Sequence, residues 1–280
     1  MKTARAVPVL MYHHVSPNPG LVTISPENFR AQMRYLAEHD WHTASLDELA
    51  RFLAGESLPK KSVVITFDDG YLDNWVYAHP VMAEYGLHGA IFLVTGWIGD
   101  GPPRPHAACS KVGAGGTAHL PATPDHGTCK RLIAAGRADE VMLRWSEIEA
   151  MRAAGTFEFH SHTHTHTRWD QIETDQSIRL NRLTEDLETS RETLRARLGA
   201  STPHLCWPQG YYDADYQRLA LASGFTHCYT TQPGTVCPGA AADALPRIVI
   251  KDRGNDWLAS RLWLYRSAFR TRFYGWFKGR

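Results

Sequence analysis

Two uninterrupted apolar runs constrain the fold of this chain more than any other feature. Residues 61–67 (KSVVITF) and 89–95 (GAIFLVT) lack the apolar–polar alternation of a half-exposed strand. Strands of this kind are buried on both faces, as in a parallel sheet covered by helices. Helical patterns separate such runs along the chain, so the order is strand, then helix, repeatedly. In 280 residues this order predicts a single α/β domain, with a distorted (β/α) barrel as the leading architecture.

Helices are expected at several places between the strands. Ser146, in a Ser-x-x-Glu pattern, is the expected N-cap of a helix over residues 146–154. One continuous helix is expected over 72–85, and a long one over roughly 175–198. Within the long helix, the apolar spacing predicts that Ile178 lies on the buried side.

The domain is expected over residues 1–255, and residues 256–280 form a separate tail. Residues 99–137 interrupt the pattern, because they are rich in Gly, Pro, Ala and Thr and lack periodicity over most of their length. An insertion of this length is typical of a functional lid or a mobile loop. Cys109 and Cys129, with nearby histidines, leave a second metal site or a disulfide there as alternatives.

Charge and the N-terminus limit the classes of partner and the location. Lys+Arg 30 against Asp+Glu 29 gives a net charge of +1, which does not favour a nucleic-acid partner. The apolar run Val7–Met11 is broken by Pro8 and is too short for a signal peptide. Five cysteines without a CxxC pair favour reduced thiols, so a cytoplasmic location is expected. Removal of a leader would leave the same sequence, and this alternative stays open.

Residues 65–71 (ITFDDGY) place two carboxylates, Asp68 and Asp69, at the end of a buried strand. The carboxyl ends of barrel strands are where catalytic residues collect. Two adjacent aspartates in a pocket resist ionising together unless a cation is present, so one could bind a metal and the other act as a base. A simple Asp-Asp-Gly turn is the alternative.

Residues 157–167 (FEFHSHTHTHT) carry a histidine at every second position. If this stretch were one strand, all four side chains would share a face; in a turn or the start of a helix, only pairs four apart would. Catalytic zinc commonly takes three His, Asp or Glu ligands and leaves a position open for water. A tract that binds metals without specificity remains the alternative. The four histidines are His160, His162, His164 and His166.

Three motifs together resemble those of the polysaccharide deacetylase family, the NodB-like carbohydrate esterases of family four. They are TFDDG at residues 66–70, SHTHTH at 161–166 and WPQG at 207–210. The resemblance extends over roughly residues 7–250, and the third motif is the loosest, because Gln209 stands where the family usually has Tyr. The family fold is a distorted (β/α) barrel.

The resemblance implies a metal site formed by Asp69, His162 and His166, with Zn²⁺ expected and Co²⁺, Ni²⁺ or Fe²⁺ as alternatives. It makes Asp68 the general base. The backbone N–H of Gln209 would stabilise a developing oxyanion, because the chain turns sharply there.

Other roles follow from how this chain departs from the usual pattern. The start, VLMYHHV, is similar to a branch of the family with permuted motifs, which gives His13 the role of general acid. Cys206 lies where the family often has an Arg that orients the base, so Arg247 is the expected partner of Asp68. Further residues are expected to contact sugar or to line the pocket. They are Tyr71, Asn74, Trp207, Pro208 and Gly210.

The tail, residues 257–280, contains six basic residues, eight aromatic residues and no acid. Its apolar residues keep helical spacing through Leu258, Leu262, Tyr265, Phe269, Phe273 and Trp276. A basic aromatic helix can lie on an anionic membrane surface, which would allow peripheral contact with the inner membrane face. The alternative is a terminal helix that packs its apolar face on the barrel.

The resemblance implies a metal-dependent hydrolase that removes N-acetyl groups from amino sugars of a polysaccharide or lipid-linked glycan. A related amidohydrolase acting on a small amide would share the fold and the metal site. A non-catalytic glycan-binding relative is the third hypothesis. An intact set of Asp68, Asp69, His162 and His166 argues against it.

Overall fold

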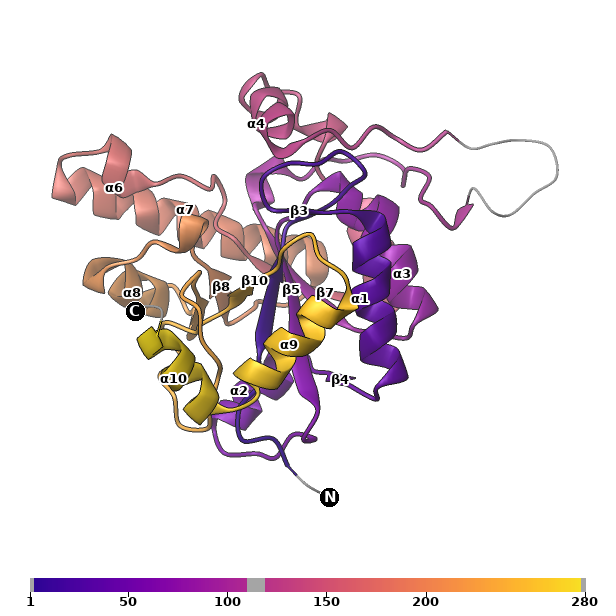
Figure 1. Cartoon of the computed structure of the whole chain (residues 1–280). Coiled ribbons are helices and arrows are strands. Elements are labelled where there is room, and N and C mark those ends of the chain that lie inside the picture. The colour runs from indigo at the N-terminus through magenta and orange to yellow at the C-terminus, as the bar shows by residue number, and fades with distance from the viewer. Residues whose placement is uncertain (1–2, 110–118, 278–280) are drawn as a thin grey trace.

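A curled parallel sheet forms the centre of the molecule, which we describe from a computed structural model over residues 3–109 and 119–277 (Figure 1). The strand order is β10-β1-β5-β6-β7-β8-β9, and β4 pairs with β5. All of these pairs are parallel. The strands are β1 (Val9–Tyr12), β4 (His42–Thr43), β5 (Ser62–Asp69), β6 (Gly89–Leu93), β7 (Phe157–Ser161), β8 (His204–Cys206), β9 (His227–Tyr229) and β10 (Ile248–Val249). A separate short ladder joins β2 (His14–Val15) and β3 (Thr23–Ile24).

The central strands are buried on both faces, as their uninterrupted apolar runs predict. Every residue of β5 and β6 is buried. The two ends of the sheet meet at one segment, because Ile248 pairs with Leu10 of β1 while Leu245 bridges Tyr229 of β9. The expected single α/β domain with a distorted barrel is therefore confirmed.

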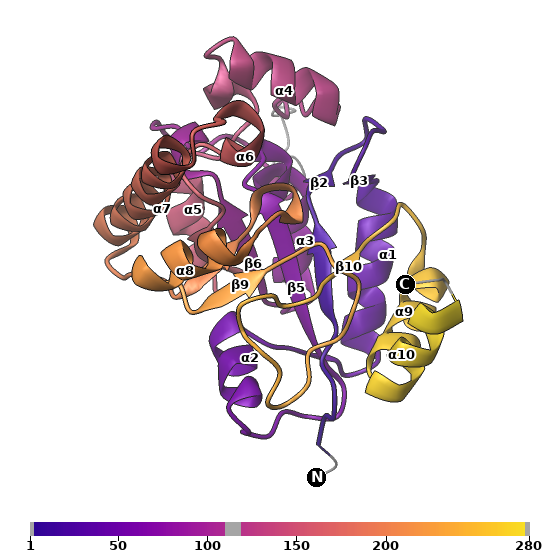
Figure 2. The same cartoon turned by 90° about the vertical axis from the view of Figure 1, so that its left-hand side faces the viewer.

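Helices cover the outside of this sheet (Figures 1 and 2). They are α1 (Pro26–Glu38), α2 (Leu46–Leu53), α3 (His79–Glu84), α4 (His126–Ala134), α5 (Trp145–Ala153), α6 (Trp169–Ile172), α7 (Gln176–Leu198), α8 (Ala214–Ala222), α9 (Asn255–Tyr265) and α10 (Ala268–Phe277). In Figure 2, α5, α7 and α8 lie on one side of the sheet, and α1 and α9 lie on the other. Within residues 3–109 and 119–277, we find no helix with the length and apolarity needed to cross a membrane.

Three details of the helices differ from the sequence expectation. Residues 72–85 are not one α-helix, since a π-helix, η1 (Asn74–Ala78), precedes α3. Ser146 is not the N-cap of α5. The N-cap is Arg144, whose backbone N–H donates to the buried Glu147 side chain (2.9 Å), so the helix begins at Trp145. Ile178 is exposed, because the first turn of α7 contacts α8, where Gln176 donates to Asp215, rather than the sheet.

The insertion and the tail each contain ordered elements. The insertion carries α4, and its residues 110–118 lie outside the described part. Cys109 is exposed and Cys129 is buried, and both are free thiols. The tail is two helices instead of one: α9 packs its buried Leu258 and Leu262 on the core, whereas α10 leaves Phe269, Phe273, Trp276 and Phe277 exposed.

Candidate active site

The carboxyl ends of the strands bring the three sequence motifs together at one edge of the sheet. Asp69 ends β5 with φ +74°, and Gly70 continues the turn with φ +85°. A Cβ at Gly70 would lie 2.7 Å from Leu93 Cδ2, so the turn needs glycine for both its conformation and its packing. The turn directs the Asp69 carboxylate towards the segment that follows β7.

Asp69, His162 and His166 form a compact donor set. The Nε2 atoms of His162 and His166 lie 3.3 Å and 3.4 Å from Asp69 Oδ1. His162 Nδ1 donates to the Cys206 carbonyl oxygen (2.8 Å), so a neutral His162 presents its Nε2 lone pair to Asp69. Within the described residues, buried Asp69 Oδ1 has no hydrogen-bond partner. Acceptors that face one another at this distance need a proton or a cation between them.

The charge of Asp69 agrees with a cation site. Burial by itself would raise the pKa of Asp69, but His162 and His166 lower it below its ordinary value. One carboxylate and two imidazoles, with one imidazole oriented by a backbone carbonyl, are the donors that a catalytic zinc site uses. These residues therefore fit a divalent metal.

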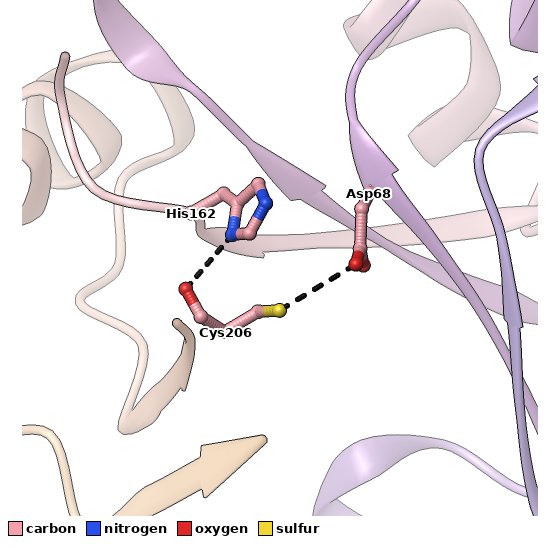
Figure 3. A group of neighbouring side chains, drawn as sticks. All are labelled: Asp68, His162 and Cys206. Atoms are coloured by element: carbon pink, nitrogen blue, oxygen red, sulfur yellow. Dashed lines mark hydrogen bonds between the residues drawn. The ribbon is translucent and has the colours of Figure 1, made fainter. Parts of the chain in front are cut away.

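A second group, Asp68, His162 and Cys206, is close enough to be considered as a ligand set (Figure 3). Its donor atoms are already used: His162 Nδ1 donates to the Cys206 carbonyl, and the Cys206 thiol lies against Asp68 Oδ2 at 3.6 Å. Burial raises the pKa of the Cys206 thiol, which favours the neutral form and not the thiolate that binds metals. The group is a hydrogen-bonded support for His162 and Asp68.

The four histidine side chains of residues 157–167 do not all point towards Asp69. His160 and His164 bond to Thr202 and Thr95 through their Nδ1 atoms. Only His162 and His166 face Asp69, because the chain turns between them, with positive φ at Thr163 and His166 itself. This placement matches the interpretation in which residues four apart act as a pair.

A buried carboxylate of α7 holds this turn in place. Asp186 Oδ1 accepts from the backbone N–H groups of His164 (2.7 Å) and Thr165 (2.8 Å). Its Oδ2 accepts from Trp169 Nε1 (3.0 Å). No local pattern predicts this role, since the partners of Asp186 lie 17 to 22 residues away along the chain.

Asp68 is held by Arg247 in a bidentate pair. Nη1 and Nη2 of Arg247 lie 2.6 Å and 2.7 Å from the two Asp68 oxygens, and both side chains are buried. Burial opposes ionisation of Asp68, but the Arg247 charge lowers the pKa of this carboxyl below its ordinary value.

His13 Nε2 lies 3.8 Å from Asp68 Oδ2. Burial lowers the pKa of His13, although Asp68 and Asp69 oppose that shift.

These groups surround a pocket of about 130 Å³, which is large enough for an acyl group. Its lining residues are His13, Leu21, Val22, Asp68, Asp69, Tyr71, Trp97, His126, Lys130, His162, His166, Trp207, Gln209, Gly210 and Thr231. Four of these residues, besides glycine, have positive φ: Val22, Asp69, His166 and Gln209. Positive φ is unusual for a β-branched residue such as Val22, and local strain of this kind clusters at functional sites.

Two of the residues expected to contact sugar are not among the pocket-lining residues. Asn74 is buried, and its amide donates to the His13 carbonyl oxygen (2.8 Å) and to Asp73 (2.9 Å). It therefore supports the His13 backbone instead of contacting a ligand. Pro208 is buried and begins the short 3₁₀ turn, η5 (Pro208–Gly210), that presents Gln209 and Gly210.

The model for the family described as polysaccharide deacetylase matches residues 55–228. The matched segment is more than half of the chain, and it contains the turns that carry Asp69, His162 and Trp207. This chain belongs to the polysaccharide deacetylase family.

Curated relatives of this deacetylase chain match it over different lengths. A stretch of 94 residues is 37% identical to YxkH of Bacillus subtilis (strain 168), and that match covers 33% of this chain and 33% of YxkH. The poly-β-1,6-N-acetyl-D-glucosamine N-deacetylase of Staphylococcus aureus is 22% identical over 243 residues, which are 85% of this chain and 71% of that protein.

Solved structures share the fold of the deacetylase chain. The Streptococcus pyogenes deacetylase PplD, in complex with acetate, aligns with a TM-score of 0.71 at 22% identity, covering 93% of this chain and 99% of PplD. IcaB from Ammonifex degensii aligns with a TM-score of 0.67 at 22% identity, covering 93% and 97%.

The pocket includes residues that the sequence analysis did not identify as pocket residues. His126 and Lys130 come from α4 of the insertion. His126 Nδ1 lies 3.2 Å from Nε2 of the buried His14, whose Nδ1 contacts Asp73 Oδ2 at 2.6 Å. Because side chains alternate between the two faces of a strand, the sequence predicts only that the His14 side chain points to the face opposite that of His13. A long-range contact to an aperiodic insertion has no local sequence signal.

Proposed function

We propose that this chain is a metal-dependent N-deacetylase that acts on N-acetylated amino sugars of a glycan. One observation carries the proposal: Asp69 Oδ1, which has no hydrogen-bond partner among the described residues, faces two imidazoles directly beside a second carboxylate held by Arg247. This arrangement supplies a place for a cation and a separate base within one pocket.

The glycan substrate is an inference from the family and from one relative. The Staphylococcus aureus relative is a poly-β-1,6-N-acetyl-D-glucosamine N-deacetylase. A pocket of about 130 Å³ suits an acetamido group better than a whole sugar, so the remaining sugar would lie outside it. The same pocket could also take a small amide, and acetate release from substrates of both kinds distinguishes the two.

Asp69, His162 and His166 would hold the metal, with Zn²⁺ expected and Co²⁺, Ni²⁺ or Fe²⁺ as alternatives. When bound, such an ion supplies Lewis acidity to a water molecule and to the acyl oxygen. His162 and His166 lower the pKa of Asp69, which favours the ionised carboxylate that binds metals.

The protein groups then divide the proton transfers between them. Asp68, kept ionised by Arg247, accepts a proton from the water whose oxygen bonds to the acyl carbon. The backbone N–H of Gln209, on the turn after β8, stabilises the negative charge that develops on the acyl oxygen. His13 gives a proton to the sugar nitrogen as the C–N bond breaks, which releases acetate and a free amine.

The first test is acetate release from N-acetylglucosamine oligomers by protein stripped of metal and then given Zn²⁺ or Co²⁺. We expect little release without metal and a large recovery with it. Metal-restored release would support N-deacetylation. Stoichiometric metal binding without acetate release from any oligomer would contradict the glycan substrate, and release only from a panel of small acetamides would favour the amidohydrolase hypothesis.

A further inference from the structure

The helix α10 presents its aromatic residues to solvent and not to the core. Phe269, Phe273, Trp276 and Phe277 are 78%, 54%, 72% and 68% exposed. Their spacing of four, three and one places them on one side of the helix. Their rings contact one another: Phe273 and Phe277 have centroids 4.8 Å apart, and Trp276 and Phe277 are separated by 5.2 Å. We call these four residues the aromatic face.

The opposite side of α10 contacts the protein through smaller or polar groups. Tyr274 packs against the core, and its hydroxyl lies 3.4 Å from Arg261 Nη1 of α9. The Thr271 hydroxyl lies 3.5 Å from the Leu264 carbonyl oxygen of α9. A surface helix normally buries its apolar side and exposes its polar side. In α10 the reverse arrangement leaves an aromatic surface without a partner among the described residues.

Cations surround the aromatic face. The Arg270 guanidinium lies 4.3 Å from the centre of the Trp263 ring, which is itself 57% exposed, and Arg272 is exposed. Arg5, Lys60 and Arg266 line a hollow beside the start of α10. Residues 257–280 contain no acid. A matching partner is therefore anionic at its surface and apolar beneath it.

We propose that the aromatic face inserts into the interfacial layer of an anionic lipid bilayer. The ten residues of α10 extend about 15 Å, half of the roughly 30 Å hydrocarbon core, so the helix would lie along the surface. Aromatic residues on one side and arginines around them are the composition of interfacial helices. Docking of two copies through this face would bring two sets of arginines together, which disfavours self-association.

The position of α10 leaves the catalytic pocket accessible. Figures 1 and 2 place α10 and α4 at opposite ends of the molecule, and α4 borders the pocket. Bilayer contact through α10 would therefore leave the α4 side of the pocket uncovered. The proposal does not depend on the deacetylase chemistry, because binding is measured without turnover.

The test is flotation of the full chain with vesicles of phosphatidylcholine alone and of phosphatidylcholine mixed with phosphatidylglycerol. We expect binding to the anionic vesicles that salt weakens. The double variant Phe273→Ser/Trp276→Ser should lower the partition coefficient about tenfold or more, since each ring loses its apolar transfer. Leu221→Ser, on the equally exposed Leu221 of α8, is the matched apolar control and should bind like the parent protein.

Two charge-reversal variants separate electrostatic attraction to the vesicle surface from insertion of the aromatic rings. Arg272→Glu should weaken binding to anionic vesicles several-fold, whereas Arg152→Glu, at an exposed position of α5, should not. Equal binding to neutral and anionic vesicles, or binding that the double variant leaves intact, would overturn the proposal. A third result would also overturn it: the protein binds no vesicles and forms a dimer that Phe273→Ser/Trp276→Ser converts to a monomer. The aromatic face would then join two copies of the chain.

Discussion

The pocket has two walls of different origin. One wall, the strand wall, is built at the ends of β5, β7 and β8 and carries Asp68, Asp69 and His162. The other, the insertion wall, is His126 and Lys130 on α4. The strand wall is fixed by buried pairs such as Asp68–Arg247. The insertion wall is held by part-buried contacts, such as those of His126 Nδ1 with His14 Nε2 (3.2 Å) and with the Tyr71 hydroxyl (3.4 Å).

This difference suggests a division of roles. Groups that bind a metal or move a proton need geometry held within fractions of an ångström, which neighbouring strands supply. An insertion can change without disturbing the sheet, so it suits contacts to the variable part of a substrate. Changes in the strand wall should therefore lower kcat, and changes in the insertion wall should mainly raise KM.

The largest effect is expected for Asp69→Ala. This change removes a proposed metal ligand and leaves two facing imidazoles, so metal content should fall and acetate release should drop by at least about a thousandfold. Metal analysis by mass spectrometry and the acetate assay measure the two effects. Asp186→Asn, which weakens the support of the turn between the two histidines but keeps Asp69, His162 and His166, should retain more metal than Asp69→Ala. Full metal occupancy in Asp69→Ala would show that the ligand set is wrong.

His13→Ala comes next, because it leaves the metal ligands in place and removes the proposed acid. We expect a loss of about a hundredfold in kcat with metal content unchanged. His42→Ala, at a partly exposed histidine that pairs with Glu48 away from the pocket, should leave turnover near the parent value. Unchanged turnover in His13→Ala would move the acid role to another group.

Arg247→Lys tests how strongly turnover depends on the bidentate contact by which Arg247 holds the Asp68 carboxylate. Lysine keeps the charge but cannot hold both Asp68 oxygens, so we expect a loss of roughly 10- to 30-fold in kcat. Arg104→Lys is the matched control: Arg104 makes a comparable bidentate pair with buried Glu147, remote from the reacting groups. It should lower the melting temperature with kcat unchanged, and an equal loss of kcat in both variants would indicate a general stability effect.

The sequence predicted the strand wall because its signals are local. Continuous apolar runs identify buried strands, and the carboxyl ends of parallel strands must lie at one edge. The order of residues along the chain is therefore enough to bring Asp68, Asp69 and the histidine stretch to one edge, whereas the choice of His162 and His166 among the four histidines came from the family resemblance. Arg247, 179 residues beyond Asp68, was predicted from the absence of the usual arginine, and the structure places it against that carboxylate.

The remaining features depend on contacts that local patterns do not encode. The apolar spacing of the tail continues from Leu258 to Trp276, yet the chain turns between α9 and α10 and reverses which side is buried. Asn74 follows an active-site motif, but its amide is needed by the His13 carbonyl. His126 reaches the pocket from an insertion without periodicity, so only tertiary packing reveals it.

The smallest loss of activity is expected for His126→Ala, which changes the insertion wall alone. His14 Nδ1 faces Asp73, so a neutral His14 uses Nε2 to accept from His126, which orients the second imidazole at the pocket. Loss of one such contact costs about 1 kcal/mol, so we expect kcat/KM to fall about fivefold, mainly through KM. Lys130→Ala, from the same helix, controls for general disturbance of α4 and should change KM by less. If His126→Ala instead lowers kcat as far as His13→Ala does, the insertion wall takes part in proton transfer, and the division between the two walls fails.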